Sequence, residues 1–194
     1  MSKSNLNIIS KLKFQLQKPK IVIVLEKEKT KSAILKVLGK YFKLEKDIFV
    51  FKADFPELDD FNFFIRNSSL PVLVLDGIKE GSFEKIKELS KIFLSKGFLV
   101  FNCDQESNKD LKFDSPRCLT YGLQVKADFQ ASEIRQSGPE DKVPGINFKV
   151  IHKGNIVPVW LENTSDQERI YSALAAITIG EIFGLNLIEA SQAL

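Results

Sequence analysis

A continuous apolar run at residues 21–25, Ile-Val-Ile-Val-Leu, is the feature that most constrains the fold of this chain. Such a run, without polar alternation, is typical of a strand that is buried on both faces of a parallel sheet. Apolar residues then recur at the spacing of one helix face, at Ile34, Val37, Leu38 and Tyr41. An amphipathic helix is therefore expected to follow the strand and to cover it.

The same alternation of strand and helix patterns continues beyond this first unit. Strands are predicted at 47–51, 70–75 and 98–101, with helices at 57–65 and from residue 83 to the Gly that precedes the last of these strands. This order predicts right-handed βαβ units and an α/β fold with a doubly wound, mostly parallel sheet of the P-loop type.

The second half of the chain has a different pattern. Residues 118–150 are polar and contain Gly-Pro and Pro-Gly pairs, which are typical of loops. Two apolar segments, 148–152 and 155–160, flank Lys153 and Gly154, a pair suited to a two-residue hairpin turn. We expect a small inserted antiparallel sheet here, followed by a helix at 166–183 and the start of another at residue 188.

Length and composition limit the domain organisation. With 194 residues, 44% hydrophobic and 27% charged, the chain has the size and composition of one globular domain, which excludes a disordered or fibrous class. We expect a basic N-terminal segment or helix at 1–17 and one α/β domain at 18–194. No spanning helix and no secretory signal is recognisable, so a cytoplasmic location is expected.

The net charge of +3 comes from the N-terminus. The first 20 residues contain five lysines and no acid, so the rest of the chain carries a net charge of −2. This distribution, and the lack of a recognised motif, argue against nucleic acid as a partner. Cys103 and Cys118 are too few for a disulfide framework or a zinc site, and we interpret both as reduced core thiols.

The first strand-to-helix turn is where a doubly wound sheet binds its ligand. Residues 25–32 read Leu-Glu-Lys-Glu-Lys-Thr-Lys-Ser, so Lys29 and Thr30 stand where a phosphate-binding loop has its Lys and Ser/Thr. No glycine precedes them. Glu26 and Glu28 also place two carboxylates where phosphate charge would have to sit, so a solvated charged turn is favoured over a working nucleotide loop.

Short segments in the same order along the chain resemble the central, ATP-binding domain of the Mur ligase family. LTYGL at 119–123 is similar to the family's ITYGL, and KADFQAS at 126–132 is similar to its KADVRAS. The branch that this chain resembles most is the UDP-N-acetylmuramoyl-tripeptide–D-alanyl-D-alanine ligases. The other similar segments are 18–24 with the Lys-Thr pair, 81–86, 101–104, 145–148, 154–159, 171–176 and 184–187.

The resemblance implies a fold, an activity and cofactors. Mur ligases form an amide bond in peptidoglycan precursor synthesis, using ATP and magnesium to activate a carboxylate as an acyl phosphate. A complete ligase of this family has three domains, of which this chain resembles only the central one. ATP and magnesium are therefore the cofactors to expect if the family activity is retained.

The family's functional positions are mostly changed in this sequence. Leu25 and Glu28 replace the two loop glycines, and Val50 stands at the position of a magnesium-binding Glu. The magnesium-binding His has no counterpart, and the carbamylated lysine falls near Ser90. The family's adenine-side His and Asn positions read Glu168, Arg169 and Ser172.

From this comparison we expect a degenerate site. The candidate nucleotide-binding residues, taken as vestigial, are Lys29, Thr30, Asn102, Asp104 and Arg169. We expect no catalytic residue and no metal ligand set among them. Asn102 and Asp104 lie at a strand end, where they either contact a ligand or cap the following turn.

Three functional hypotheses remain open from the sequence. The leading one is a non-catalytic Mur ligase homologue that acts as a binding or scaffold domain, docking to a complete Mur ligase or to the missing domains in trans. The second is an active or split ATP-dependent ligase that uses Lys29 and Thr30. The third is an unrelated α/β domain that binds a small molecule.

Other features have simpler interpretations. His152 at a hairpin end is interpreted as a surface or packing residue, and the acidic run 54–60 as a charged helix N-terminus. The dense phenylalanines at 61–64 are expected in the core or at an interface. A helix over residues 5–16 either packs on the domain or, through Ile8, Ile9, Leu12 and Leu16 with lysines nearby, touches a membrane surface.

Overall fold

The computed structural model describes residues 8–77, 82–108, 111, 113–137 and 143–194. Within them, eight strands form one mixed sheet in the order β2-β1-β3-β4-β5-β6-β7-β8. Neighbouring strands pair in parallel from β2 to β6, and β6 to β8 pair antiparallel. The strands are β1 (Lys20–Leu25), β2 (Ile48–Ala53), β3 (Pro71–Leu75), β4 (Phe98–Asn102), β5 (Cys118–Gly122), β6 (Phe129–Gln136), β7 (Gly145–His152) and β8 (Asn155–Glu162).

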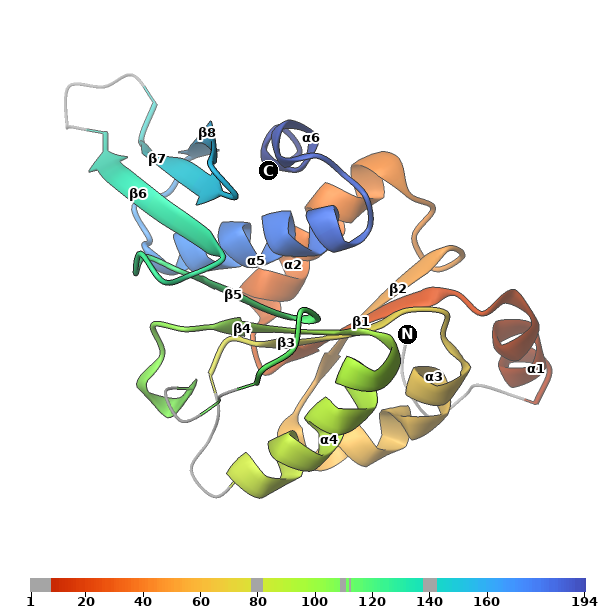
Figure 1. Ribbon diagram of the computed structural model, residues 1–194. Coiled ribbons are helices and arrows are strands. Elements are labelled where there is room, and N and C mark those ends of the chain that lie inside the picture. The colour runs from red at the N-terminus through yellow and green to blue at the C-terminus, as the bar shows by residue number, and fades with distance from the viewer. Residues whose placement is uncertain (1–7, 78–81, 109–110, 112, 138–142) are drawn as a thin grey trace.

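Helices cover both faces of the parallel part of the sheet (Figure 1). One layer contains α2 (Glu28–Tyr41), α5 (Glu168–Ile182) and α6 (Leu187–Ser191). The other contains the 3-10 helix η2 (Phe55–Phe61), α3 (Asn62–Asn67) and α4 (Phe83–Lys96), and α1 (Ile8–Gln17) packs at its edge. A short 3-10 helix, η3 (Glu106–Asn108), follows β4. The predicted α/β, doubly wound, mostly parallel architecture is confirmed.

The first strand is apolar throughout because each of its faces is buried in a different core. Val22 and Val24 lie in the cluster under α2 and α5. Ile21, Ile23 and Leu25 lie in the cluster under α3 and α4. All five side chains are at most 2% exposed, so neither face of β1 can accept a polar residue at low cost.

The antiparallel strands extend the parallel sheet and are not a separate inserted sheet. Strand β6 pairs in parallel with β5 on one side and antiparallel with β7 on the other. The predicted hairpin turn is confirmed, since Lys153 and Gly154 have φ angles of 47° and 80°, as a type I′ turn requires. In such a hairpin the residues that flank the turn, His152 and Asn155, form a hydrogen-bonded pair. Every second residue of β8 from there directs its backbone N–H and C=O toward β7. Pro158 belongs to the other set, whose backbone groups face the open edge of the sheet.

Two details of the predicted elements were wrong. Segment 118–150 was expected to be loop, but it contains β5 and β6. Strand β5 is only five residues long, and a bulge interrupts the pairing of β6 between Ser132 and Arg135, so neither shows a clear pattern. In place of the expected helix at 57–65 the structure has the 3-10 helix η2 followed by the short α3. Asp54 and Glu57 form a capping box that starts η2 before residue 57.

None of the helices among the described residues is long and apolar enough to cross a membrane.

Gly97, between α4 and β4, marks a point where two backbones touch. A Cβ added there would lie 1.8 Å from the carbonyl oxygen of Pro71. We predict that Gly97→Ala lowers the free energy of unfolding by about 2–4 kcal/mol, because β4 must move away from the start of β3. Urea denaturation measures the change.

Gly154→Ala is the matched control for this substitution. It adds the same methyl group at a hairpin tip where nothing lies within 4 Å, so only the positive φ is strained, at about 1 kcal/mol. A Gly97→Ala protein as stable as the Gly154→Ala protein would contradict the packing argument.

Candidate functional site

The candidate site lies at the carboxyl edge of the parallel strands, where β1, β3, β4 and β5 end and α2 and α5 begin (Figure 1). In a doubly wound sheet this edge is the usual place for a ligand. It also holds predicted candidates, since Thr30 lies in the first turn of α2 and Asn102 ends β4. The geometry of this edge decides what it can bind.

The turn between β1 and α2 is closed on itself. The amide of Glu26 donates to the carbonyl of Ala53 at 3.1 Å, and that of Lys27 donates to the carbonyl of Leu25 at 2.8 Å. Glu26 has a φ of 59°, which a glycine would adopt at lower cost. A phosphate-binding loop needs its amides free to wrap phosphate oxygens, and here these two are already bonded to carbonyls.

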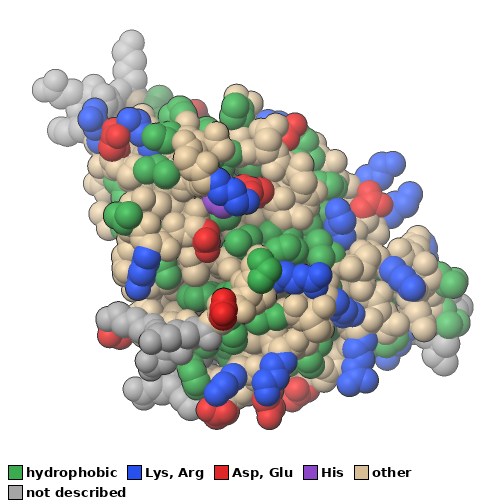
Figure 2. Space-filling view, viewed as in Figure 1, with side chains coloured by type: hydrophobic (Ala, Val, Ile, Leu, Met, Phe, Trp, Pro, Cys, Tyr) green, Lys and Arg blue, Asp and Glu red, His purple; other side chains and the backbone are tan. Residues whose placement is uncertain are grey.

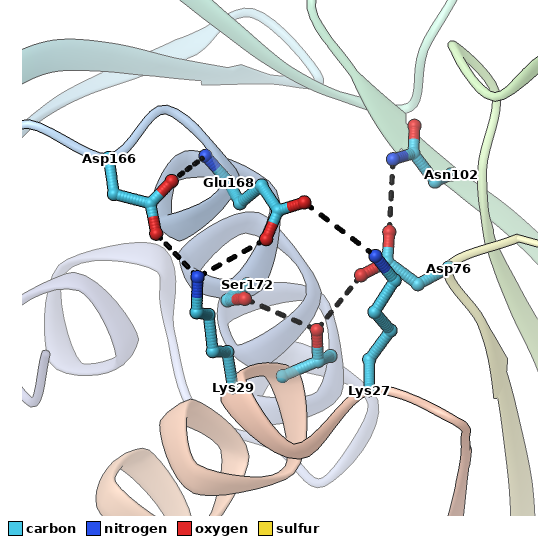
Figure 3. Close-up of polar contacts among 8 residues, drawn as sticks. Lys27, Lys29, Asp76, Asn102, Asp166, Glu168 and Ser172 are labelled. Atoms are coloured by element: carbon cyan, nitrogen blue, oxygen red, sulfur yellow. Dashed lines mark hydrogen bonds and ion pairs between the residues drawn. The ribbon is translucent and has the colours of Figure 1, made fainter.

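Behind this turn lies a buried polar network centred on Asp76 (Figure 3). The hydroxyl of Thr30 donates to Asp76 Oδ2 at 3.0 Å and lies 3.2 Å from the hydroxyl of Ser172. The side-chain amide of Asn102 donates to Asp76 Oδ1 at 3.1 Å. Thr30 and Asn102 are fully buried and Asp76 is 5% exposed. Both oxygens of the carboxylate are therefore hydrogen-bonded within the protein.

Two tyrosines extend the network. Burial raises the pKa of Tyr121 well above its ordinary value, and the neighbouring Asp76 carboxylate adds to this effect. Burial, then the charge of Asp104, raises the pKa of Tyr171 to about 12. Both phenols therefore stay protonated in the physiological pH range.

Asn102 and Asp104 fasten the end of β4 to its neighbours. The side-chain oxygen of Asn102 accepts a hydrogen bond from the amide of Asp104 at 3.0 Å, which is the geometry of an Asx turn. The carboxylate of Asp104 accepts from the amide of Leu123, next to β5. Gly122 allows this approach, because a Cβ there would lie 2.8 Å from an Asp104 oxygen.

Lys29 points away from the network, toward the start of α5 (Figure 3). Its ammonium lies 2.6 Å from Asp166 and 3.3 Å from Glu168, while Lys27 lies 3.8 Å from Glu168. The hydrogen bond to Asp166, then that to Glu168, raises the pKa of Lys29, and the bond from Lys29 lowers the pKa of Asp166. The pair is therefore fully charged at neutral pH. The lysine that stands where a phosphate-binding loop has its Lys has two carboxylates as its partners.

The five predicted candidates thus fall into two groups. Thr30 and Asn102 meet at Asp76, with Asp104 next to them. Lys29 lies at the exposed mouth with Arg169, whose charge also lowers the pKa of Asp166. Asp76 was missed as a candidate, although it follows β3 directly, as Asn102 ends β4.

The residues at this edge do not fit magnesium-bound ATP as the resemblance would require. Two amides of the turn are bonded to carbonyls, and the lysine is bonded to carboxylates. A carboxylate about 5 Å from a phosphate charge is repelled by about 3 kcal/mol at an effective dielectric of about 20, and Glu26 and Glu28 flank the turn. Over the described parts of the chain, no group of three or more His, Cys, Asp or Glu could hold a metal ion.

The other candidates have structural roles. His152 is 5% exposed, and its ring stacks on Phe129 with centroids 3.7 Å apart. Its nitrogens lie 2.6 Å from the carbonyl of Asp128 and 2.9 Å from Glu181. The acidic run at 54–60 covers nearly all of η2, and its Asp54 and Glu57 cap the start of that helix. These positions agree with the packing histidine and the charged helix N-terminus expected from the sequence.

The fold places the chain among known structures. No family model and no curated protein sequence gives a significant match. Among solved structures, MurF from Acinetobacter baumannii matches with a TM-score of 0.66 at 12% identity, over 95% of this chain and 47% of that one. The chain has a Mur-ligase-like fold.

Two further structures support this likeness. The MurF ligase from Thermotoga maritima, in complex with ADP, gives a TM-score of 0.68 at 14% identity, over 93% of this chain and 50% of that one. The UDP-N-acetylmuramate:L-alanyl-gamma-D-glutamyl-meso-diaminopimelate ligase from Neisseria meningitides gives 0.60 at 18% identity, over 95% and 67%. The Mur-ligase-like chain spans about half the length of either MurF structure.

Asp76 is predicted to be the residue that this edge needs most for stability. Asp76→Ala leaves the buried donors of Thr30 and Asn102 without an acceptor, so it should lower the free energy of unfolding by about 2–4 kcal/mol. Chemical denaturation followed by circular dichroism measures this. Asp59→Ala, which removes a surface pair with Lys85, is the control and should change stability little. Equal losses in the two variants would contradict the network.

The two cysteines are predicted to be unreactive in the folded protein. Both are free, Cys103 buried and Cys118 half-buried. Burial, then Asp104, raises the pKa of Cys103 to about 11, and burial, then Asp128, raises that of Cys118 to about 12. At about pH 8 almost no thiolate is present, so Ellman's reagent should react slowly with the native chain and rapidly after unfolding. A fast phase in the native protein would contradict this.

Proposed function

We propose that this Mur-ligase-like domain does not turn over ATP by itself and acts as a binding or scaffold domain. The observation that carries the proposal is the closed β1–α2 turn, in which the amides of Glu26 and Lys27 are bonded to carbonyls and Lys29 is bonded to Asp166. Enzymatic phosphoryl transfer depends on positioning the phosphates and neutralising their charge. In this turn two amides are bonded to carbonyls and the lysine is paired with carboxylates, so these groups are not available for either task.

The partner in this proposal is a complete Mur ligase or another chain that carries the other ligase domains. The support is the Mur-ligase-like fold. The role would belong to peptidoglycan precursor synthesis, as the resemblance implies. The polar network around Asp76 then has a structural task, holding α2, β3, β4 and α5 in the arrangement that a partner recognises.

An active or split ligase is the second candidate function, and one observation favours it. The Thr30 hydroxyl lies 3.0 Å from the buried Asp76 carboxylate, and a loop Ser/Thr with an acid at a strand end is the pair that holds magnesium in P-loop enzymes. The ion pairs of Lys29 are also exposed, so they are cheap to exchange for another anion. The third hypothesis, an unrelated α/β domain, would have been favoured by a structure without the antiparallel sheet, and β7 and β8 are present.

Titration calorimetry with ATP and magnesium tests the proposal. We expect no binding heat at millimolar ATP, because the Glu26 and Lys27 amides and the Lys29 ammonium are already bonded within the protein. Lys29→Ala should then behave as the native chain does. Micromolar binding that is lost in Lys29→Ala and kept in Lys31→Ala, whose lysine pairs with Glu28 on the same helix, would overturn the proposal in favour of a ligase.

A further inference from the structure

Among the described side chains of helix α1, residues 11–17, Phe14 is the one buried against the domain. Phe14 is 5% exposed, and its ring centroid lies 5.0 Å from that of Phe64 and 5.5 Å from that of Phe49. Of the other side chains described on this helix, Lys11 contacts the same cluster, with its ammonium 5.6 Å from the ring centre of Phe63. Residues 11–18 are otherwise exposed.

The opposite side of this helix carries an unpartnered apolar face. Leu12 is 54% exposed and Leu16 is 84% exposed. Residues four apart lie one above the other on a helix, so these leucines form one face. With about 100° between successive residues, that face points away from Phe14 and from the domain.

The surroundings of the leucine face are positively charged. Lys13 and Lys18 are exposed, Lys11 lies over the Phe63 ring with its side chain also exposed, and no acidic residue occurs between residues 1 and 20. In Figure 2, Lys and Arg side chains gather on the right of the molecule, the side on which Figure 1 draws α1, and acidic side chains are few there. The face therefore complements a surface that is both apolar and negatively charged.

We propose that α1 is an interfacial helix, which docks on a membrane surface that contains anionic phospholipid. The two leucine side chains protrude from the surface of the helix. Lipid accepts protruding side chains without a preformed pocket, whereas a folded protein partner would need such a pocket. The lysines can extend toward the headgroups while their stems cover apolar surface. Each lysine near such a surface strengthens binding by roughly fivefold.

This role does not compete with the carboxyl edge of the sheet. Helix α1 precedes the amino end of β1, while the turn with Lys29 follows its carboxyl end. Docking through α1 therefore leaves the network around Asp76 and the start of α5 uncovered. The proposal holds whether or not the domain binds ATP.

Co-sedimentation of the full chain with phospholipid vesicles tests the proposal. The probes are pure phosphatidylcholine vesicles and vesicles in which about a third of the lipid is phosphatidylglycerol. We expect sedimentation only with the anionic vesicles, and weaker binding as salt is added. Leu16→Asp should lower the partition coefficient about tenfold, because it puts a negative charge on the helix face that would enter the lipid.

Ile156→Asp is the matched control. It makes the same kind of change at a residue that is 58% exposed on β8, outside α1, and should bind vesicles as the native chain does. Circular dichroism confirms that both variants fold. No binding to anionic vesicles, equal binding to neutral ones, or equal losses in the two variants would overturn the proposal. So would light scattering that shows a dimer which Leu16→Asp dissociates, because the face would then be a protein interface.

Discussion

Burial of the central strands on both faces is the constraint on which the rest of this structure depends. Valines of β1, β3 and β4 point into the layer formed by α2 and α5, while the alternate residues point into the layer formed by α3 and α4. A strand of this kind has no polar face, so helices must cover both sides of the sheet. Parallel pairing then brings the carboxyl ends of all these strands to one edge, where the chain can place polar groups.

At that edge the chain uses its polar side chains mainly to bind itself together. Asp76 receives hydrogen bonds from two neighbouring elements, and Asp104 joins the end of β4 to the end of β5. A buried carboxylate with all its oxygens bonded is rigid, and it keeps the strand ends in register. The exposed pairs of Lys29 are looser contacts at the mouth of the same edge. This edge thus contains a buried, fully bonded network around Asp76 and, at its surface, ion pairs of Lys29 that can exchange partners.

The sequence predicted β1 to β4 and their helices well, because continuous runs such as 21–25 and helices with one apolar face have few other solutions. It also predicted the hairpin of β7 and β8, but it missed β5 and β6, which join the two parts of the sheet. Strand β6 is broken by a bulge at Ser132, so its apolar residues do not alternate regularly. At the site, residue type located Thr30 and Asn102, but not their common partner. Asp76 looked like an ordinary turn residue, since only the fold shows that Thr30, 46 positions away in the chain, donates to it.

Pro158 has a consequence for how this molecule behaves in a crowded solution. Strand β8 is the last of the sheet, and its outer side is a row of backbone groups that a second extended chain could pair with. Proline has no N–H to donate, so the middle of that row lacks a donor. An incoming strand would lose a hydrogen bond at its centre and would meet a rigid ring there. The antiparallel extension therefore ends the sheet in a form that discourages its growth into larger aggregates.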